Sequence, residues 1–199
     1  MKTENVVLMQ MAKESLIGKW GLAIGTLVVY ILISVALQLI PFVGPIASLI
    51  ISGPFALGLA NFSLSISRNQ DPKLENIFKG FNNFGTALAA NLLMSLFVIL
   101  WLLLLIIPGI IAAISYSMTF YIIADDNSIG AMDAIDKSKK MMDGYKLKYF
   151  YLGLRFFGLG LLCILTLGIG FLWLMPYMQV SMAKFYDDVK ANSLSTENF

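Results

Sequence analysis

The chain has 199 residues, of which 58% are hydrophobic and only 13% are charged, with a formal net charge of +2. A soluble domain is about half apolar and about a quarter charged, so this composition favours an integral membrane protein and gives no reason to expect a nucleic-acid partner. Histidine is absent and Cys163 is the sole cysteine, which excludes a disulfide framework and removes the commonest metal ligand and general base.

The N-terminal segment, residues 1–17, does not have the pattern of a cleavable signal peptide. Its apolar positions are interrupted by charges, among them Glu4 and Lys13, whereas the apolar region of a signal peptide is continuous. Leu8 and Ala12 follow the spacing of one helical face. The segment therefore predicts an amphipathic helix that lies on a membrane or on a partner helix.

Six apolar runs follow, and a helix of about 20 residues spans a bilayer core of about 30 Å. Short uncharged breaks that contain proline or glycine join the runs in pairs, which predicts three helical hairpins. The fourth and sixth runs are short enough to lie against the others, and re-entrant pairs are an alternative. The runs are 20–40, 45–66, 84–107, 110–124, 149–167 and 171–186.

Two polar segments separate the hairpins, and each contains an amphipathic pattern. At 71–81, Asp71 can cap a helix and Pro72 suits its first position. At 127–145, acidic residues twice precede lysines by four positions, an arrangement that stabilises a helix. An amphipathic helix is thus predicted before every hairpin.

The three helix–hairpin segments resemble one another. Gly18, Gly80 and Gly144 each follow an amphipathic pattern and precede a hairpin, at similar spacings. A charged residue closes each hairpin, namely Arg68, Asp125 and Asp187. We interpret the chain as one membrane domain, 1–199, with a threefold internal repeat at 1–68, 69–126 and 127–190.

Charge placement predicts the orientation of the chain. All 14 lysines and arginines lie in the N-terminal segment, the two polar segments, the first turns of the fifth run or the C-terminal end. The positive-inside rule then places both termini and both long loops in the cytoplasm. The expected fold is an all-α, multi-pass membrane helix bundle of six transmembrane helices in three hairpins, each preceded by a cytoplasmic amphipathic helix.

Four polar side chains interrupt the apolar runs at a similar predicted depth, about 10 Å inside the cytoplasmic boundary at about 1.5 Å per residue. They are Asn61, Asn91, Arg155 and Gln179. One interpretation is a polar cluster in a cytoplasm-facing cavity, where Arg155 binds an anionic lipid headgroup or substrate. The other is structural: the amides join helices through hydrogen bonds, and the arginine extends to the interface.

Motifs for catalysis are absent from the sequence, which has no P-loop, G-x-S-x-G, H-E-x-x-H or C-x-x-C. Two pairs of adjacent acids, 125–126 and 187–188, could hold a cation or act as acid and base. Adjacent acids at such a boundary more often cap a helix and stay solvated. We therefore expect no catalytic residues, no metal and no cofactor.

The stretches at 104–152 and 165–189 carry the motifs IPGII and LGIGFLWLMPY. They resemble a bacterial family of six-helix integral membrane proteins catalogued as a domain of unknown function (DUF nine-seven-five), whose relatives include the membrane domain of some glycerophosphodiester phosphodiesterases. The resemblance covers most of the chain and implies a bacterial cytoplasmic membrane, with no established activity. The chain departs from the family pattern at Ser128, where the family has proline, and at Arg155, where the family has a small polar residue.

We therefore expect a non-enzymatic protein with an accessory role in the bacterial cytoplasmic membrane: envelope stress, export or immunity to membrane-active peptides. Its amphipathic helices would contact the lipid bilayer, including anionic headgroups, or a membrane or cytoplasmic protein partner. The alternative is a transporter or channel for a small or lipid-like anion, and an enzyme acting on lipid phosphates is a third hypothesis.

Overall fold

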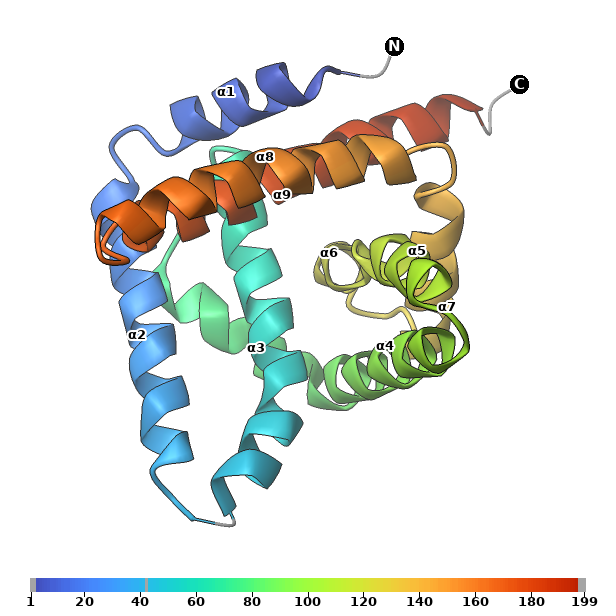
Figure 1. The fold of residues 1–199 in the computed structure, drawn as a ribbon, viewed down its shortest axis with the longest axis horizontal. Coiled ribbons are helices and arrows are strands. Elements are labelled where there is room, and N and C mark those ends of the chain that lie inside the picture. Colours follow the sequence, from blue (N-terminus) through green and yellow to red (C-terminus); the bar gives the residue numbers. More distant parts are fainter. Residues whose placement is uncertain (1–2, 42, 197–199) are drawn as a thin grey trace.

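The structure is a computed structural model that describes residues 3–41 and 43–196, and every regular element in these ranges is a helix. Long helices make up most of it (Figure 1). The elements are α1 (Asn5–Ser15), α2 (Trp20–Gln38), α3 (Val43–Ser67), the 3-10 helix η1 (Leu74–Asn83), α4 (Phe84–Leu104), α5 (Ile106–Tyr116), α6 (Thr119–Asp125), α7 (Ala131–Met141), α8 (Lys146–Leu165) and α9 (Phe171–Thr196).

The three glycines that precede the hairpins serve two different purposes. Gly18 and Gly144 have φ angles of +77° and +72°, in the left-handed region that favours glycine, and so they end α1 and α7. Gly80 is needed for close packing instead. A Cβ atom at Gly80 would lie 1.9 Å from the carbonyl oxygen of Pro54 in α3.

The polar segment after the first hairpin forms the 3-10 helix η1, whereas the pattern at 71–81 predicts an α-helix. Its backbone lies very close to α3, since a Cβ atom at Gly58 would be 1.8 Å from the carbonyl oxygen of Ile77. The narrower 3-10 coil permits this approach. Asp71 does not cap the helix, because the N-cap position is Lys73.

The fourth predicted run, 110–124, is interrupted at 117–118, where α5 gives way to α6. Ser138 of α7 fills the break. Its hydroxyl accepts a hydrogen bond from the N–H of Met118 at 3.2 Å and donates one to the carbonyl oxygen of Ser115 at 2.8 Å. Buried backbone groups need such partners, so Ser138 satisfies two groups at the interruption.

Five helical stretches of the described chain are long and apolar enough to cross a membrane: Trp20–Gln38, Gly44–Ser67, Leu74–Leu104, Ile106–Asp125 and Lys146–Leu165. They correspond to the first five predicted runs. The helix of the sixth run, α9, continues to Thr196, and its second half carries four charged residues. A sixth span therefore stays a prediction.

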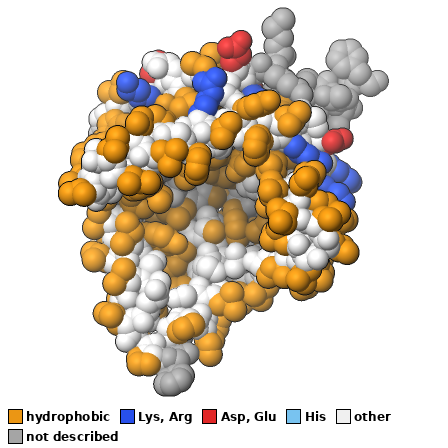
Figure 2. Space-filling view, in the orientation of Figure 1, with side chains coloured by type: hydrophobic (Ala, Val, Ile, Leu, Met, Phe, Trp, Pro, Cys, Tyr) orange, Lys and Arg blue, Asp and Glu red, His pale blue; other side chains and the backbone are white. Residues whose placement is uncertain are grey.

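Much of the apolar surface faces outward. In the most apolar stretch of α2, only 17% of the residues are buried. In the corresponding stretches of the segments that contain α4 and α8, only 11% are buried. Figure 2 shows apolar side chains over most of one face, with charged side chains along its upper and upper right edges. Leaving apolar surface in water costs about 25 cal/mol per Å², and contact with lipid removes this cost.

The amphipathic elements interlock the hairpins. α1 packs against α9, η1 packs against α3, and α7 packs against α5 and α6. In Figure 1, α2 and α3 run from top to bottom of the view, whereas α8 and α9 run across it. The helix axes are therefore not parallel throughout the molecule.

The core is built mainly from the amphipathic elements and the second helix of each pair. Its fully buried large side chains include Leu8, Leu16, Ile66, Ile77, Ile122, Ile135, Phe185 and Tyr186.

Candidate functional site

The charged residues that close the three hairpins lie together. Arg68 directly follows α3, Asp125 ends α6 and Asp187 lies in α9. Nη1 of Arg68 is 2.6 Å from Oδ1 of Asp125, and its Nη2 is 2.7 Å from Oδ1 of Asp187. One planar guanidinium thus bridges two carboxylates, which a lysine cannot reproduce. We call Arg68, Asp125 and Asp187 the charge hub.

Neighbouring side chains complete the hydrogen bonds of the charge hub. Tyr186 donates its hydroxyl proton to Oδ2 of Asp125 at 2.8 Å, and Nζ of Lys190 is 2.5 Å from the same oxygen. The Ser67 hydroxyl donates to Oδ2 of Asp187 at 3.0 Å. Each carboxylate oxygen of the hub therefore has a donor within the protein.

The charge hub is partly buried. The side chains of Asp125, Arg68 and Asp187 are 12%, 31% and 30% exposed. Loss of water disfavours isolated charges, so these groups depend on one another. Burial, and then the charge of Asp125, raises the pKa of Tyr186, which keeps its hydroxyl protonated as a donor.

A second ion pair joins α8 to α9, and its carboxylate also holds the N-terminal segment through a hydrogen bond. Nζ of Lys148 in α8 is 2.6 Å from Oδ2 of Asp188 in α9, and the two side chains are 14% and 9% exposed. The N–H of Thr3 donates to Oδ1 of Asp188 at 3.3 Å. Asp188, like Asp125, is thus not the solvated acid that the pattern of adjacent acids predicts.

Asp126 does match that prediction. It is exposed and accepts hydrogen bonds from the N–H and the hydroxyl of Ser128, at 3.0 and 2.6 Å. These hydrogen bonds lower the pKa of Asp126. Ser128 therefore stabilises the turn after α6. Within the described ranges, no group of three or more Asp, Glu, Cys or His side chains could hold a metal ion.

The two predicted asparagines make hydrogen bonds within the protein. The amide of Asn61 donates to the carbonyl oxygen of Leu57 in its own helix at 3.0 Å. The amide of Asn91 in α4 donates to the hydroxyl of Ser52 in α3 at 2.8 Å. The second bond joins two hairpins, as the structural interpretation of these residues expects.

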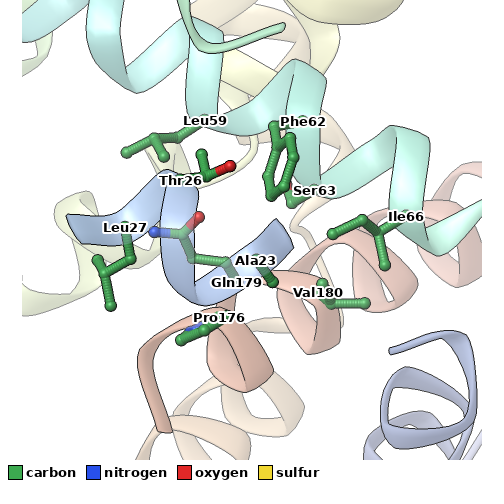
Figure 3. A pocket seen from close by; sticks show the side chains of 10 residues that line it. All are labelled: Ala23, Thr26, Leu27, Leu59, Phe62, Ser63, Ile66, Pro176, Gln179 and Val180. Carbon is green, nitrogen blue, oxygen red and sulfur yellow. The ribbon is translucent and has the colours of Figure 1, made fainter. Parts of the chain in front are cut away.

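Gln179 lines a small cavity between α2, α3 and α9 (Figure 3). The volume is about 10 Å³, roughly what one water molecule needs. Thr26 faces this cavity, is 1% exposed, and its hydroxyl bonds to no other described residue. In Figure 3 the amide of Gln179 extends toward Thr26. The cavity suits one water molecule and is too small for a substrate.

Arg155 lies elsewhere, in an open groove of about 700 Å³ between the start of α1 and the first half of α8. No hydrogen bond or ion pair joins it to another residue of the described ranges. None of the hydrogen bonds in those ranges links two of the four predicted polar residues. The groove is lined by Thr3, Glu4, Asn5, Val6, Leu147, Lys148, Tyr151, Leu154 and Arg155.

These features define an all-α protein with helices long and apolar enough to span a membrane, and its second helices are joined by partly buried ion pairs. A family model described as "Protein of unknown function (DUF975)" matches residues 1–108 and 97–193. The chain therefore belongs to this family, which confirms the resemblance found in the sequence. No curated protein and no solved structure matches the chain.

Proposed function

We propose that this is a non-enzymatic accessory protein of the bacterial cytoplasmic membrane that protects the cell from membrane-active peptides or envelope stress. The charge hub supports the non-enzymatic part of this proposal. Carboxylates that could act as acid, base or cation ligand already have donors in the protein, so they hold the hairpins together instead of facing a substrate. Outside the hub, the molecule offers an extensive apolar surface to lipid.

We also propose that the chain consists of three repeats, 1–68, 69–126 and 127–190, arranged as a closed ring. Two observations support this arrangement. The amphipathic element that begins each repeat packs on the second helix of another repeat: α1 on α9, η1 on α3, and α7 on α5 and α6. The residues at the equivalent closing position of each repeat meet in the charge hub.

The orientation is part of the same proposal. The charge hub and the amphipathic elements lie at the cytoplasmic side, and the hairpin turns lie in or beyond the lipid. The positive-inside rule supports it. An ancestral link to the membrane domains of glycerophosphodiester phosphodiesterases stays a prediction.

An anion transporter has less support. It needs a polar cavity of substrate size at the depth of the four polar residues. Gln179 instead faces a cavity for about one water molecule, and Asn61 and Asn91 are engaged in hydrogen bonds.

A complementation experiment tests the accessory role. A deletion strain carries the wild-type gene, an empty vector, Arg68→Ala or Asp126→Asn, and its survival is measured against membrane-active cationic peptides. Wild type and Asp126→Asn should restore survival, because Asp126 is exposed and bonds only to Ser128. Arg68→Ala should restore less, in proportion to its reduced level in the membrane. Equal survival with wild type and empty vector would refute the protective role.

A further inference from the structure

Arg155 is an exposed cation on an apolar face of α8. Its exposed neighbours Tyr151, Leu154 and Phe157 are 57%, 52% and 63% accessible, a surface typical of contact with lipid. A charged side chain at such a surface pairs with another group or reaches the interface, because lipid solvates it poorly.

The geometry of the helix directs Arg155 toward the interface. In an α-helix, the Cα–Cβ bonds tilt toward the N-terminus, and the N-terminus of α8 is its charged end, where Lys146 and Lys148 lie. Arg155 is about 14 Å along the helix at about 1.5 Å per residue. Its long side chain can therefore reach the level of lipid headgroups.

The groove around Arg155 carries one further charge without a partner. Lys148 is engaged by Asp188, at 2.6 Å, and contributes no net charge. Glu4 lines the same groove and is exposed. It occupies the N-cap position of α1 but makes no side-chain capping bond, and it forms no ion pair with Arg155 or with any other described residue. The groove therefore presents one available cation and one available anion.

The remaining lining is apolar on the side of α8. Leu147, Tyr151 and Leu154 form this wall, and Leu147 is 72% exposed. A ligand that fits the groove has a phosphate for the guanidinium, a cation for the carboxylate and hydrocarbon for the wall. Arginine binds phosphate through two parallel hydrogen bonds.

From this charge complementarity we propose that the groove binds a zwitterionic phospholipid whose headgroup combines a phosphodiester with a primary ammonium. Arg155 binds the phosphate, Glu4 binds the ammonium, and the wall of Leu147, Tyr151 and Leu154 contacts the acyl chains. The site rests on the proposed insertion into a bilayer but does not depend on the protective role.

Native mass spectrometry of the purified full chain tests the site, with phosphatidylethanolamine, phosphatidylglycerol and phosphatidylcholine added separately. The wild type should bind phosphatidylethanolamine most tightly. Arg155→Gln should weaken binding of all three lipids about tenfold, because it removes the charge-assisted bonds to phosphate. Glu4→Gln should weaken phosphatidylethanolamine alone and strengthen phosphatidylglycerol, because it removes an anion from the groove. Neither side chain has a partner in the described ranges, so both variants should fold.

Controls separate the sources of the effect. Lys137→Gln removes an exposed cation of α7 outside the groove and should leave lipid binding unchanged. An excess of inorganic phosphate should not displace the lipid. Wild-type binding by Arg155→Gln would overturn the proposal, as would displacement by free phosphate. An equal change in the binding of phosphatidylethanolamine and phosphatidylglycerol by Glu4→Gln would also overturn it, because Glu4 would then not distinguish the ammonium headgroup. Failure of this test leaves the survival experiment unaffected.

Discussion

Replacing Arg68 by alanine removes the group that bridges the first hairpin to the second and third. The breaking of a fully buried ion pair costs about 3–5 kcal/mol, whereas an exposed pair contributes about 0–1 kcal/mol. Arg68 is 31% exposed and Asp125 is 12% exposed, and Asp125 keeps Tyr186 and Lys190 as donors. We therefore expect an intermediate loss of about 2 kcal/mol, which lowers the unfolding temperature by about 4–8 °C for a chain of this size.

Thermal unfolding of the purified protein in detergent, followed by tryptophan fluorescence, measures this change. Arg68→Lys should show about half the loss, because lysine keeps the charge but cannot bridge both carboxylates. The matched control is Lys73→Ala, which removes an exposed pair with Asp71 at 3.8 Å and should shift stability by less than about 0.5 kcal/mol. If Arg68→Ala and Lys73→Ala unfold at the same temperature, the hub does not join the hairpins.

Three further predictions concern packing, the helix break and orientation. Gly58→Ala should reduce thermal stability by about 2 kcal/mol or more, because the added Cβ would meet the backbone of η1. The control Gly153→Ala, whose added Cβ would have no atom within 4 Å, should leave stability unchanged or raise it slightly. Equal effects of the two variants would refute the close approach of α3 and η1. Ser138→Ala should cost about 1–3 kcal/mol in the same assay, because it leaves buried backbone groups without partners, and a neutral effect would show that the break satisfies itself. The orientation is tested with single cysteines in a protein whose native cysteine is replaced by serine. A membrane-impermeant thiol reagent applied to whole cells should label Leu167→Cys, at the third turn, but not Asn69→Cys, beside the charge hub. The reverse labelling pattern would invert the proposed topology.

The sequence predicts the all-α character and the apolar helices well, because hydropathy and the proline- and glycine-containing breaks are local signals. It predicts the interruption between α5 and α6 poorly. No proline or glycine marks that break, and the group that stabilises it, Ser138, lies far along the chain. The sequence cannot identify the backbone that Ser138 contacts, because that contact depends on how α7 packs against α5 and α6. The 3-10 form of η1 was missed for the same reason, because it depends on the close approach of α3.

The candidate site was likewise predictable only in part from the sequence. Arg68, Asp125 and Asp187 could be recognised as residues that close each hairpin, but their meeting depends on how the second helices converge. Equal depth suggested a cluster of Asn61, Asn91, Arg155 and Gln179. Depth along a helix does not specify which face a side chain occupies, and these four side chains have separate surroundings.

The connections between the beginning and the end of the chain affect its biosynthesis. Arg68 leaves the ribosome long before Asp187, and α1 packs on α9, the last helix to be made. Until translation finishes, Arg68 has an incomplete set of partners and α1 lacks the surface of α9 on which it packs. A chain that stops short of α9 therefore lacks both the surface that covers α1 and one of the two carboxylates that Arg68 bridges.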